Sequence, residues 1–385
     1  MRNISFLLGA GFSVNQGYPV ASKLNQKIID LTKDDFGISS LQTIFKIEDN
    51  DDYTLNYSHI RTFLIELVAH YNNTYGEFNY EMFYDYYKKL QDNVIEDGSE
   101  DIIEKYIGPS LEIDRLNLIS RMNSIFNQVI QMLISDGGDT RYYKKVHKCK
   151  GTLPSYIGFL NLIEKLKVDT SIYLHTLNHD LFLEYLNDTD EFSGEMWNGF
   201  IELGSPYYSE SDYGNVRLEY FNDVFESNIR LYKLHGSFDQ VMFKENGLSD
   251  KCIKLRYGVD SFRIKKEVIE NGKYLYKDDI THYSSDFLSG TTSKILKYHE
   301  LGYYKIMFSH FTNNLAEADK LIIIGYGCLD SEINKMIDSS LKKGCEIYMV
   351  DPYPSNVVQD FAKSHGARLI DKTPADITLE DFDEN

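Results

Sequence analysis

Apolar residues in this chain occur in two patterns, as short unbroken runs and at helical spacing. Short runs rich in apolar residues predict strands at 4–8, 171–174, 230–234, 320–324, 346–350 and 368–370. The clearest is 320–324, which has the apolar run expected of a strand covered on both faces. Helical spacing predicts helices between them, at 21–31, 180–186, 331–341 and 356–364. Strands that alternate with helices predict an α/β fold with a doubly wound parallel sheet.

Three more helices are predicted with no strand pattern between them, at 57–71, 78–90 and 116–134. We therefore expect a helical insertion module at 35–150 and a Rossmann-like nucleotide-binding core made of 1–34 and 151–385. Two further insertions, near 191–228 and 243–303, show no regular pattern. The chain is interpreted as one catalytic unit, 1–385, with no sensor domain visible.

Acidic residues outnumber basic ones by 59 to 40, so the net charge is −19. Such a surface repels phosphate backbones, which argues against autonomous nucleic-acid binding and suits a basic protein partner. The most acidic stretch, Asp371–Asn385, is expected to be a solvated end. The many Tyr and Phe residues fit either core and surface positions or subunit interfaces, and we favour interfaces.

The four cysteines, Cys149, Cys252, Cys328 and Cys345, form no CxxC pair. This spacing supports neither a zinc ribbon nor a disulfide framework, and it favours a reduced, cytoplasmic setting. No apolar run approaches the length of roughly 18 residues that a membrane-spanning helix needs, so no membrane segment is expected.

Gly9, Ala10, Gly11, Phe12 and Ser13 form a glycine-rich turn between a predicted strand and a predicted helix. Glycines let the backbone approach a pyrophosphate, and a helix N-terminus offers N–H groups to its charge. The pattern lacks both the full dinucleotide fingerprint and the lysine of a P-loop. A purely structural turn is the alternative.

A second candidate loop follows the predicted strand at 171–174 and contains Thr176, Asn178, His179 and Asp180. Asn178 can hold a ribose hydroxyl or a water molecule, because its amide both donates and accepts. Asp180 either caps the next helix or contacts a ligand. His175 and His179 are four residues apart across a strand end, a poor arrangement for zinc.

Two more loops follow predicted strands. His235 stands before Gly236 and Ser237, and the glycine leaves the imidazole accessible. Further along, Gly325 and Tyr326 follow the strand at 320–324, and Asp351 follows the strand at 346–350. A carboxylate in such a position commonly accepts from an adenosine ribose.

Together, Gly-Ala-Gly-Phe-Ser at 9–13, Thr-x-Asn-x-Asp at 176–180, Leu-His-Gly-Ser at 234–237, Gly-Tyr-Gly at 325–327 and Val-Asp at 350–351 resemble the sirtuin-like proteins. The chain looks closest to the bacterial branch that hydrolyses NAD in antiphage defence. Gly17-Tyr18-Pro19 also matches the Gly-x-Pro after the family's first loop. The match covers roughly 1–30 and 152–370.

The resemblance implies a role for each loop. Residues 9–13 would hold the pyrophosphate and the nearby ribose, Asn178 would orient the water or ribose, and His235 would be the general base. The other implied NAD-binding residues are His179 and Asp180 near the nicotinamide amide, Gly325 and Tyr326 at the phosphates or ribose, Asp351 at the adenosine ribose, and Thr176, Gly236 and Ser237. It further implies a homo-oligomer and a HerA-type ATPase partner.

The chain departs from protein-deacylating sirtuins in two places. It cannot build their four-cysteine zinc module, and Val20-Ala21-Ser22 replaces the usual Asp-Phe-Arg. These departures indicate that water, and not an acylated protein, attacks NAD. They also indicate that the chain binds no metal. The alternatives are a non-catalytic NAD or ADP-ribose sensor, a partner-activated nuclease and, last, a deacylase.

Overall fold

The computed structural model describes most of the chain, with gaps: residues 2–38, 44–46, 58–92, 94–108, 113–134, 153–187, 189–211, 214–245, 249–255, 259–277, 280–284 and 302–383. It divides by contact into two units. The first is Met1–Tyr18, Lys145–Phe287 and Lys297–Asn385, and the second is Pro19–Lys144 and Leu288–Leu296. The first division thus falls at residue 18, whereas the sequence predicted residue 34. The predicted boundary at 150/151 and Cys149 lie outside the described residues.

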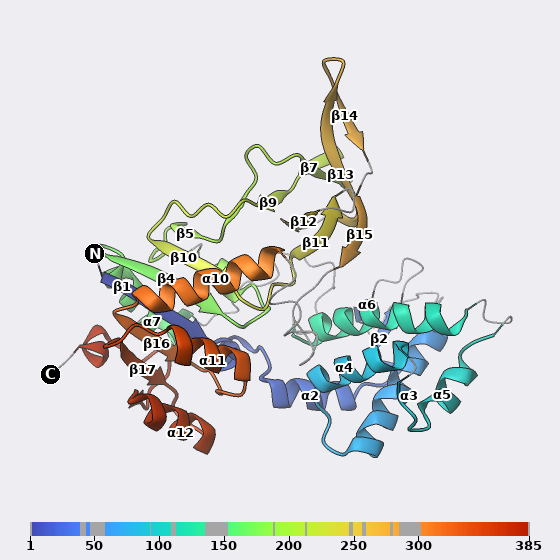
Figure 1. Ribbon diagram of the computed structural model, residues 1–385, viewed down its shortest axis with the longest axis horizontal. Coiled ribbons are helices and arrows are strands. Elements are labelled where there is room, and N and C mark those ends of the chain that lie inside the picture. The colour runs from blue at the N-terminus through green and yellow to red at the C-terminus, as the bar shows by residue number, and fades with distance from the viewer. Residues whose placement is uncertain are drawn as a thin grey trace. The chain divides into compact units, whose positions relative to one another are not determined.

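A seven-stranded parallel sheet forms the centre of the first unit, in the order β18-β17-β16-β1-β4-β10-β5 (Figure 1). Its strands are β1 (Arg2–Leu8), β4 (Thr170–Thr176), β5 (Met196–Trp197), β10 (Ile229–Lys233), β16 (Lys320–Ile324), β17 (Glu346–Val350) and β18 (Arg368–Ile370). The chain passes from β1 to one half of the sheet and later builds the other half from β16. This arrangement confirms the predicted α/β class and the doubly wound, Rossmann-like parallel sheet.

Helices flank this sheet, as the alternating pattern predicted. They are α1 (Ala10–Ser13), η1 (Val14–Gln16), η2 (Leu153–Tyr156), α7 (Ile157–Leu166), α8 (Phe182–Leu186), α10 (Gly302–Glu317), α11 (Ser331–Ser340), α12 (Asn356–His365) and η3 (Leu379–Phe382). The apolar run of β1 is buried throughout from Ile4 to Leu8, as expected for a strand covered on both faces. The sheet therefore holds the core that positions the loops at its ends.

The two segments without a regular sequence pattern contain antiparallel strands. One sheet has the order β15-β11-β12-β9-β6 and another β14-β13-β7-β8. Their bounds are β6 (Phe200–Ile201), β7 (Tyr207–Ser211), β8 (Gly214–Arg217), β9 (Glu219–Phe221), β11 (Gln240–Glu245), β12 (Ser249–Lys254), β13 (Val259–Glu270), β14 (Lys273–Lys277) and β15 (Ile280–Ser284). Figure 1 shows β13 and β14 as a long hairpin.

In the part of the second unit that the structure describes, helices predominate beside the hairpin of β2 (Phe36–Ile38) and β3 (Ile44–Lys46). Its helices are α2 (Ala21–Ile29), α3 (Ser58–Tyr75), α4 (Tyr80–Gln91), α5 (Ser99–Lys105) and α6 (Arg115–Ile134). Tyr71, Phe83 and Phe126 pack with ring centroids 5.0–5.4 Å apart in its interior. Part of the aromatic excess therefore lies in this core and needs no subunit interface.

The acidic C-terminal stretch is not a solvated end, so that expectation was wrong. Ile377 and Phe382 are buried, and Lys372 pairs with Asp381 at 2.7 Å. Apolar residues spaced among the acidic ones anchor the segment to the first unit. In the described part of the chain, no helix combines the length and apolarity needed to cross a membrane.

Candidate active site at the carboxyl edge of the sheet

The five candidate loops lie at one edge of the first unit's sheet, because they follow the carboxyl ends of parallel strands. Leu177 N–H donates to Leu8 O at 3.1 Å, and Leu234 N–H donates to Thr176 O at 2.9 Å. On the other side, Gly325 N–H donates to Val350 O at 3.2 Å. Ligands of doubly wound sheets bind at this edge, where the chain changes direction between two neighbouring strands. Here those strands are β1 and β16.

Two glycine turns pack against each other at that point. Gly11 N–H donates to Gly325 O at 2.9 Å, and Gly9 N–H donates to Ile324 O at 3.0 Å. A Cβ at Gly9 would lie 2.5 Å from Gly325 O, and a Cβ at Gly325 would lie 2.4 Å from Phe12 N. The glycines therefore have a packing function, which the sequence offered as the alternative to phosphate binding.

The two ends of the first loop differ in exposure. Ala10 and Gly11 are exposed, whereas Phe12 and Ser13 are buried. The Phe12 ring packs against Phe159 at 5.0 Å, so its side chain belongs to the core. Ala10 and Gly11 are therefore the solvent-exposed part of this loop.

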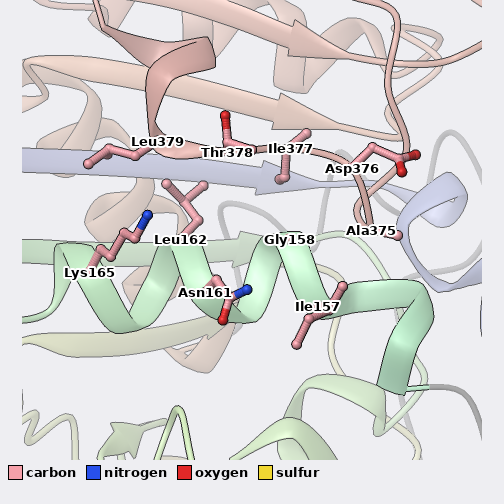
Figure 2. A pocket seen from close by; sticks show the side chains of 10 residues that line it. All are labelled: Ile157, Gly158, Asn161, Leu162, Lys165, Ala375, Asp376, Ile377, Thr378 and Leu379. Atoms are coloured by element: carbon pink, nitrogen blue, oxygen red, sulfur yellow. The ribbon is translucent and has the colours of Figure 1, made fainter.

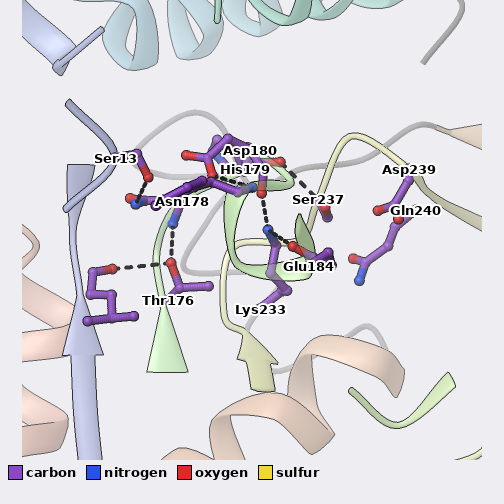
Figure 3. A network of polar contacts seen from close by, with 12 residues as sticks. Ser13, Thr176, Asn178, His179, Asp180, Glu184, Lys233, Ser237, Asp239 and Gln240 are labelled. Carbon is purple, nitrogen blue, oxygen red and sulfur yellow. Dashed lines mark hydrogen bonds and ion pairs between the residues drawn. The ribbon is translucent and has the colours of Figure 1, made fainter. Parts of the chain in front are cut away.

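Asn178 connects the second loop to the first (Figure 3). Its Nδ2 donates to Gly9 O at 2.9 Å and to Ser13 Oγ at 3.0 Å. Its backbone N–H donates to Thr176 Oγ1 at 3.1 Å, and Thr176 Oγ1 donates to Leu8 O at 3.3 Å. Because both amide hydrogens are engaged, a ligand would meet the Oδ1 atom of Asn178.

Asp180 is buried beneath the same loop, and its Oδ1 accepts from Phe182 N–H at 3.0 Å. Asp180 therefore binds the first residue of α8, whose N-cap residue is Leu181. Burial raises the pKa of the Asp180 carboxyl, and the nearby Lys233 charge opposes that rise.

His179 and His235 lie side by side at the ends of β4 and β10. Their ring centroids are 6.1 Å apart, and both residues are buried. Ser237 Oγ donates to His179 O at 3.4 Å, which joins the two loops, and Gly236 makes the intervening turn with φ 80°. The two motifs, remote in sequence, are thus adjacent in the fold.

The sequence reasoning missed Asp330. Its Oδ2 lies 3.4 Å from His235 Nε2. It stands at the N-cap of α11, where its Oδ1 accepts from Glu332 N–H at 3.0 Å and from Ile333 N–H at 3.2 Å. An acidic residue immediately before a helix, five residues after Gly325, was the available signal.

Tyr326 and Asp351 also make contacts within the protein. The Tyr326 hydroxyl donates to Asn334 Oδ1 at 2.9 Å, and burial raises the pKa of this phenol. Asp351 is half-buried, and its Oδ1 accepts from Tyr353 N–H at 2.8 Å. A ligand at this end of the edge would meet the Gly325 backbone and the remaining acceptor capacity of Asp351.

A buried ionic cluster beneath the loops was also missed by sequence reasoning. Lys233 Nζ donates to Asp180 O and lies 3.5 Å from Glu184 Oε2. Lys254 Nζ lies 3.4 Å from both Glu184 Oε1 and Asp239 Oδ2. Burial acts to raise the pKa of Glu184, but Lys233 and Lys254 outweigh it and hold that pKa below its ordinary value. The lysine inside the apolar run 229–234 was the available signal.

His175 lies inside the sheet and away from these loops. Its Nδ1–H donates to Phe6 O at 3.1 Å, and its Nε2 accepts from Asn314 Nδ2 at 3.1 Å. Burial lowers the pKa of His175 to about 3, so the ring is neutral. Among the residues that the structure describes, no three His, Cys, Asp or Glu side chains group to hold a metal ion.

A cavity of about 160 Å³ lies elsewhere in the first unit, between α7 and the C-terminal segment (Figure 2). Its lining is Ile157, Gly158, Asn161, Leu162, Lys165, Ala375, Asp376, Ile377, Thr378 and Leu379. None of these ten is a candidate site residue. This cavity is therefore separate from the loops at the carboxyl edge.

Comparisons with known proteins add the following. No protein-family description matches the chain. No curated protein sequence matches it either. Among solved structures, a mutant Sir2 homologue in complex with 2′-O-acetyl ADP-ribose is similar, with 10% identity, a TM-score of 0.35, and coverage of 97% of this chain and 87% of that one. A Sir2 homologue in complex with NAD is similar at 10% identity and a TM-score of 0.32, with coverage of 97% and 84%.

Proposed function

We propose that this chain binds NAD at the carboxyl edge of its parallel sheet and hydrolyses it to ADP-ribose and nicotinamide. One observation carries the proposal: a glycine turn, a carboxamide and an imidazole come from three separate loops to the same edge, where doubly wound sheets bind nucleotides. The motif resemblance to sirtuin-like proteins supports the same reaction class.

Each loop has a proposed role in binding. The exposed backbone at Ala10 and Gly11 would face the pyrophosphate, with Gly325 beside it. Asp351 would accept from the adenosine ribose. Asn178 Oδ1 would accept from a ribose hydroxyl or from the attacking water, because its Nδ2 holds the glycine loop.

His235 is the proposed general base. It would take a proton from a ribose hydroxyl or from the water that attacks C1′ of the nicotinamide ribose. The bond between C1′ and the nicotinamide nitrogen breaks, its electron pair leaves with neutral nicotinamide, and the proton passes to solvent. General base assistance of this kind contributes about 10²- to 10⁴-fold to a rate.

We also propose a biological setting, on the motif resemblance. The chain would act in the bacterial cytoplasm as a homo-oligomeric effector that depletes NAD during phage infection. A HerA-type ATPase partner would activate it, since a constitutive NAD hydrolase would harm its host. The acidic net charge of −19 supports a partner with a basic surface.

The test measures the release of nicotinamide from NAD by the purified protein, alone and together with the proposed HerA-type ATPase partner. His235→Ala should abolish release while circular dichroism shows that the fold is retained. His365→Ala, a histidine replacement on α12, should leave release unchanged. Asn178→Ala should also abolish release, with a stability loss of about 2 kcal/mol for two hydrogen bonds. Parental rates in both site variants would refute the proposed function.

The second candidate is a non-catalytic NAD or ADP-ribose sensor. It is favoured by the contacts of Asn178 Nδ2 and of the Tyr326 hydroxyl, which are engaged within the protein itself. Isothermal titration calorimetry separates the two: binding of NAD with no nicotinamide release, with or without the ATPase, selects the sensor.

A further inference from the structure

The side chain of Asp330 faces the imidazole of His235. Asp330 Oδ2 and His235 Nε2 are 3.4 Å apart, and the two side chains are 14% and 7% exposed. When His235 is protonated, an ion pair so shielded from water is much stronger than one at the surface. The two residues come from different halves of the sheet, after β16 and after β10.

The carboxylate of Asp330 is held in its orientation by α11. Its Oδ1 accepts the N–H groups of Glu332 and Ile333, which leaves Oδ2 directed at His235. Its carbonyl oxygen accepts from Asn334 N–H at 3.0 Å and from the Tyr326 hydroxyl at 3.1 Å. One oxygen thus caps the helix, and the other is positioned for the imidazole.

The loop that carries Asp330 is itself fixed in place. Cys328 has a left-handed φ of 58°, and its carbonyl accepts from Asn334 Nδ2 at 2.8 Å. Gly325, at the start of this loop, packs on the backbone of Gly11. The left-handed conformation of Cys328 is costly for a non-glycine residue, and it persists because the surrounding contacts enforce it.

Asp330 and the ring of His179 both face the His235 ring. The negative charge of Asp330 stabilises a protonated imidazole, whereas a protonated His179 would oppose it. Pairs in which a carboxylate orients a histidine base recur in enzymes of unrelated fold.

We propose that Asp330 is the positioning residue of His235: it orients the imidazole and stabilises the imidazolium that forms when His235 accepts a proton. The proposal rests on the proposed function in its catalytic part, but the pairing itself does not. Through the loop 325–330, the same contact couples the imidazole to the glycine turn at 9–13.

The experiment compares Asp330→Asn with the parent protein. Asn also caps helices well, so α11 is retained while the charge is removed. The pKa of His235, followed by NMR and assigned with His235→Gln, should fall by about 1 unit or more. The kcat/KM for NAD should fall at least about tenfold, a part of what a general base contributes. The acidic limb of the pH profile of kcat/KM should move to lower pH, because a base of lower pKa stays neutral at a more acidic pH.

Asp338→Asn is the matched control. Asp338, also on α11, pairs with His365 Nε2 at 2.6 Å. This variant removes a carboxylate from a histidine pair outside the candidate site and should leave both the pKa of His235 and kcat/KM unchanged. Asp330→Ser, which keeps a capping oxygen, replaces Asp330→Asn if the latter melts early.

The outcomes are distinguishable. An unchanged pKa of His235 in Asp330→Asn overturns the pairing, even if NAD is cleaved. A lowered pKa with unchanged kcat/KM and an unmoved acidic limb overturns the positioning role. If the parent releases no nicotinamide, the proposed function fails, and a lowered pKa of His235 still upholds the pairing.

Discussion

Gly9, Gly11 and Gly325 meet through their backbones at the centre of the carboxyl edge. The sequence predicted this turn from its glycines and its place between a strand and a helix. It did not predict that their partner would be another glycine more than 300 positions away. Close backbone approach depends on tertiary packing, so neither turn's own sequence contains that information.

Gly325→Ala should destabilise the protein by about 2–4 kcal/mol, because it combines overpacking with a strained backbone. The added Cβ would lie 2.4 Å from Phe12 N, and φ at Gly325 is 63°. Gly327→Ala is the control, since its Cβ would meet nothing closer than Leu329 Cγ at 3.9 Å. Urea denaturation measures both, and equal midpoints would contradict the packing argument.

At the scale of elements, the strands and helices around the candidate site were predictable because short runs rich in apolar residues alternate with helical spacing along the chain. The strands at 320–324, 346–350 and 368–370 have the predicted bounds. The antiparallel strands between 200 and 284 were not predicted, since they are rich in polar residues and partly exposed. The ionic cluster around Lys233 was likewise invisible, because its members come from separate elements.

β4 is fastened to β1 and α10 by His175, which makes stability depend on pH. Its pKa of about 3 is below the ordinary 6.5 of the unfolded chain, so the unfolded state binds the proton first. Stability should therefore fall as the pH drops below 6.5, by up to about 1.4 kcal/mol per pH unit from this residue.

Urea denaturation of the parent and His175→Gln between about pH 5.5 and 7 checks this dependence. The variant should be less stable than the parent near pH 7 and should show a shallower loss of stability on acidification. Parallel curves for the two proteins would mean that protonation of His175 does not contribute.

For the molecule as a whole, the alternating pattern of strands and helices predicted the fold, and the net charge narrowed the classes of partner. They could not define the unit boundary, because α2 continues the pattern of the core in sequence yet clusters with the helical unit. The net charge of −19 nevertheless separates the remaining functional alternatives, since a nuclease must hold a phosphate backbone.

The purified chain should not bind duplex DNA at about 0.15 M salt, where electrostatic attraction governs nonspecific binding. Fluorescence anisotropy of a labelled duplex measures this directly. Tight binding by the chain alone would revive the nuclease alternative, whereas binding that requires the ATPase would locate the basic surface on the partner.

The burial of Lys233 and Lys254 gives the protein two internal reporters of its own motion. Amine-selective acylating reagents need a neutral, accessible nitrogen, and both side chains are at most 7% exposed. Their labelling should lag far behind that of surface lysines and proceed only as fast as this part of the fold opens. Mass spectrometry of the two peptides would then measure the rate of local opening beneath the candidate site. A bound nucleotide that stabilises this region should slow the labelling of both lysines.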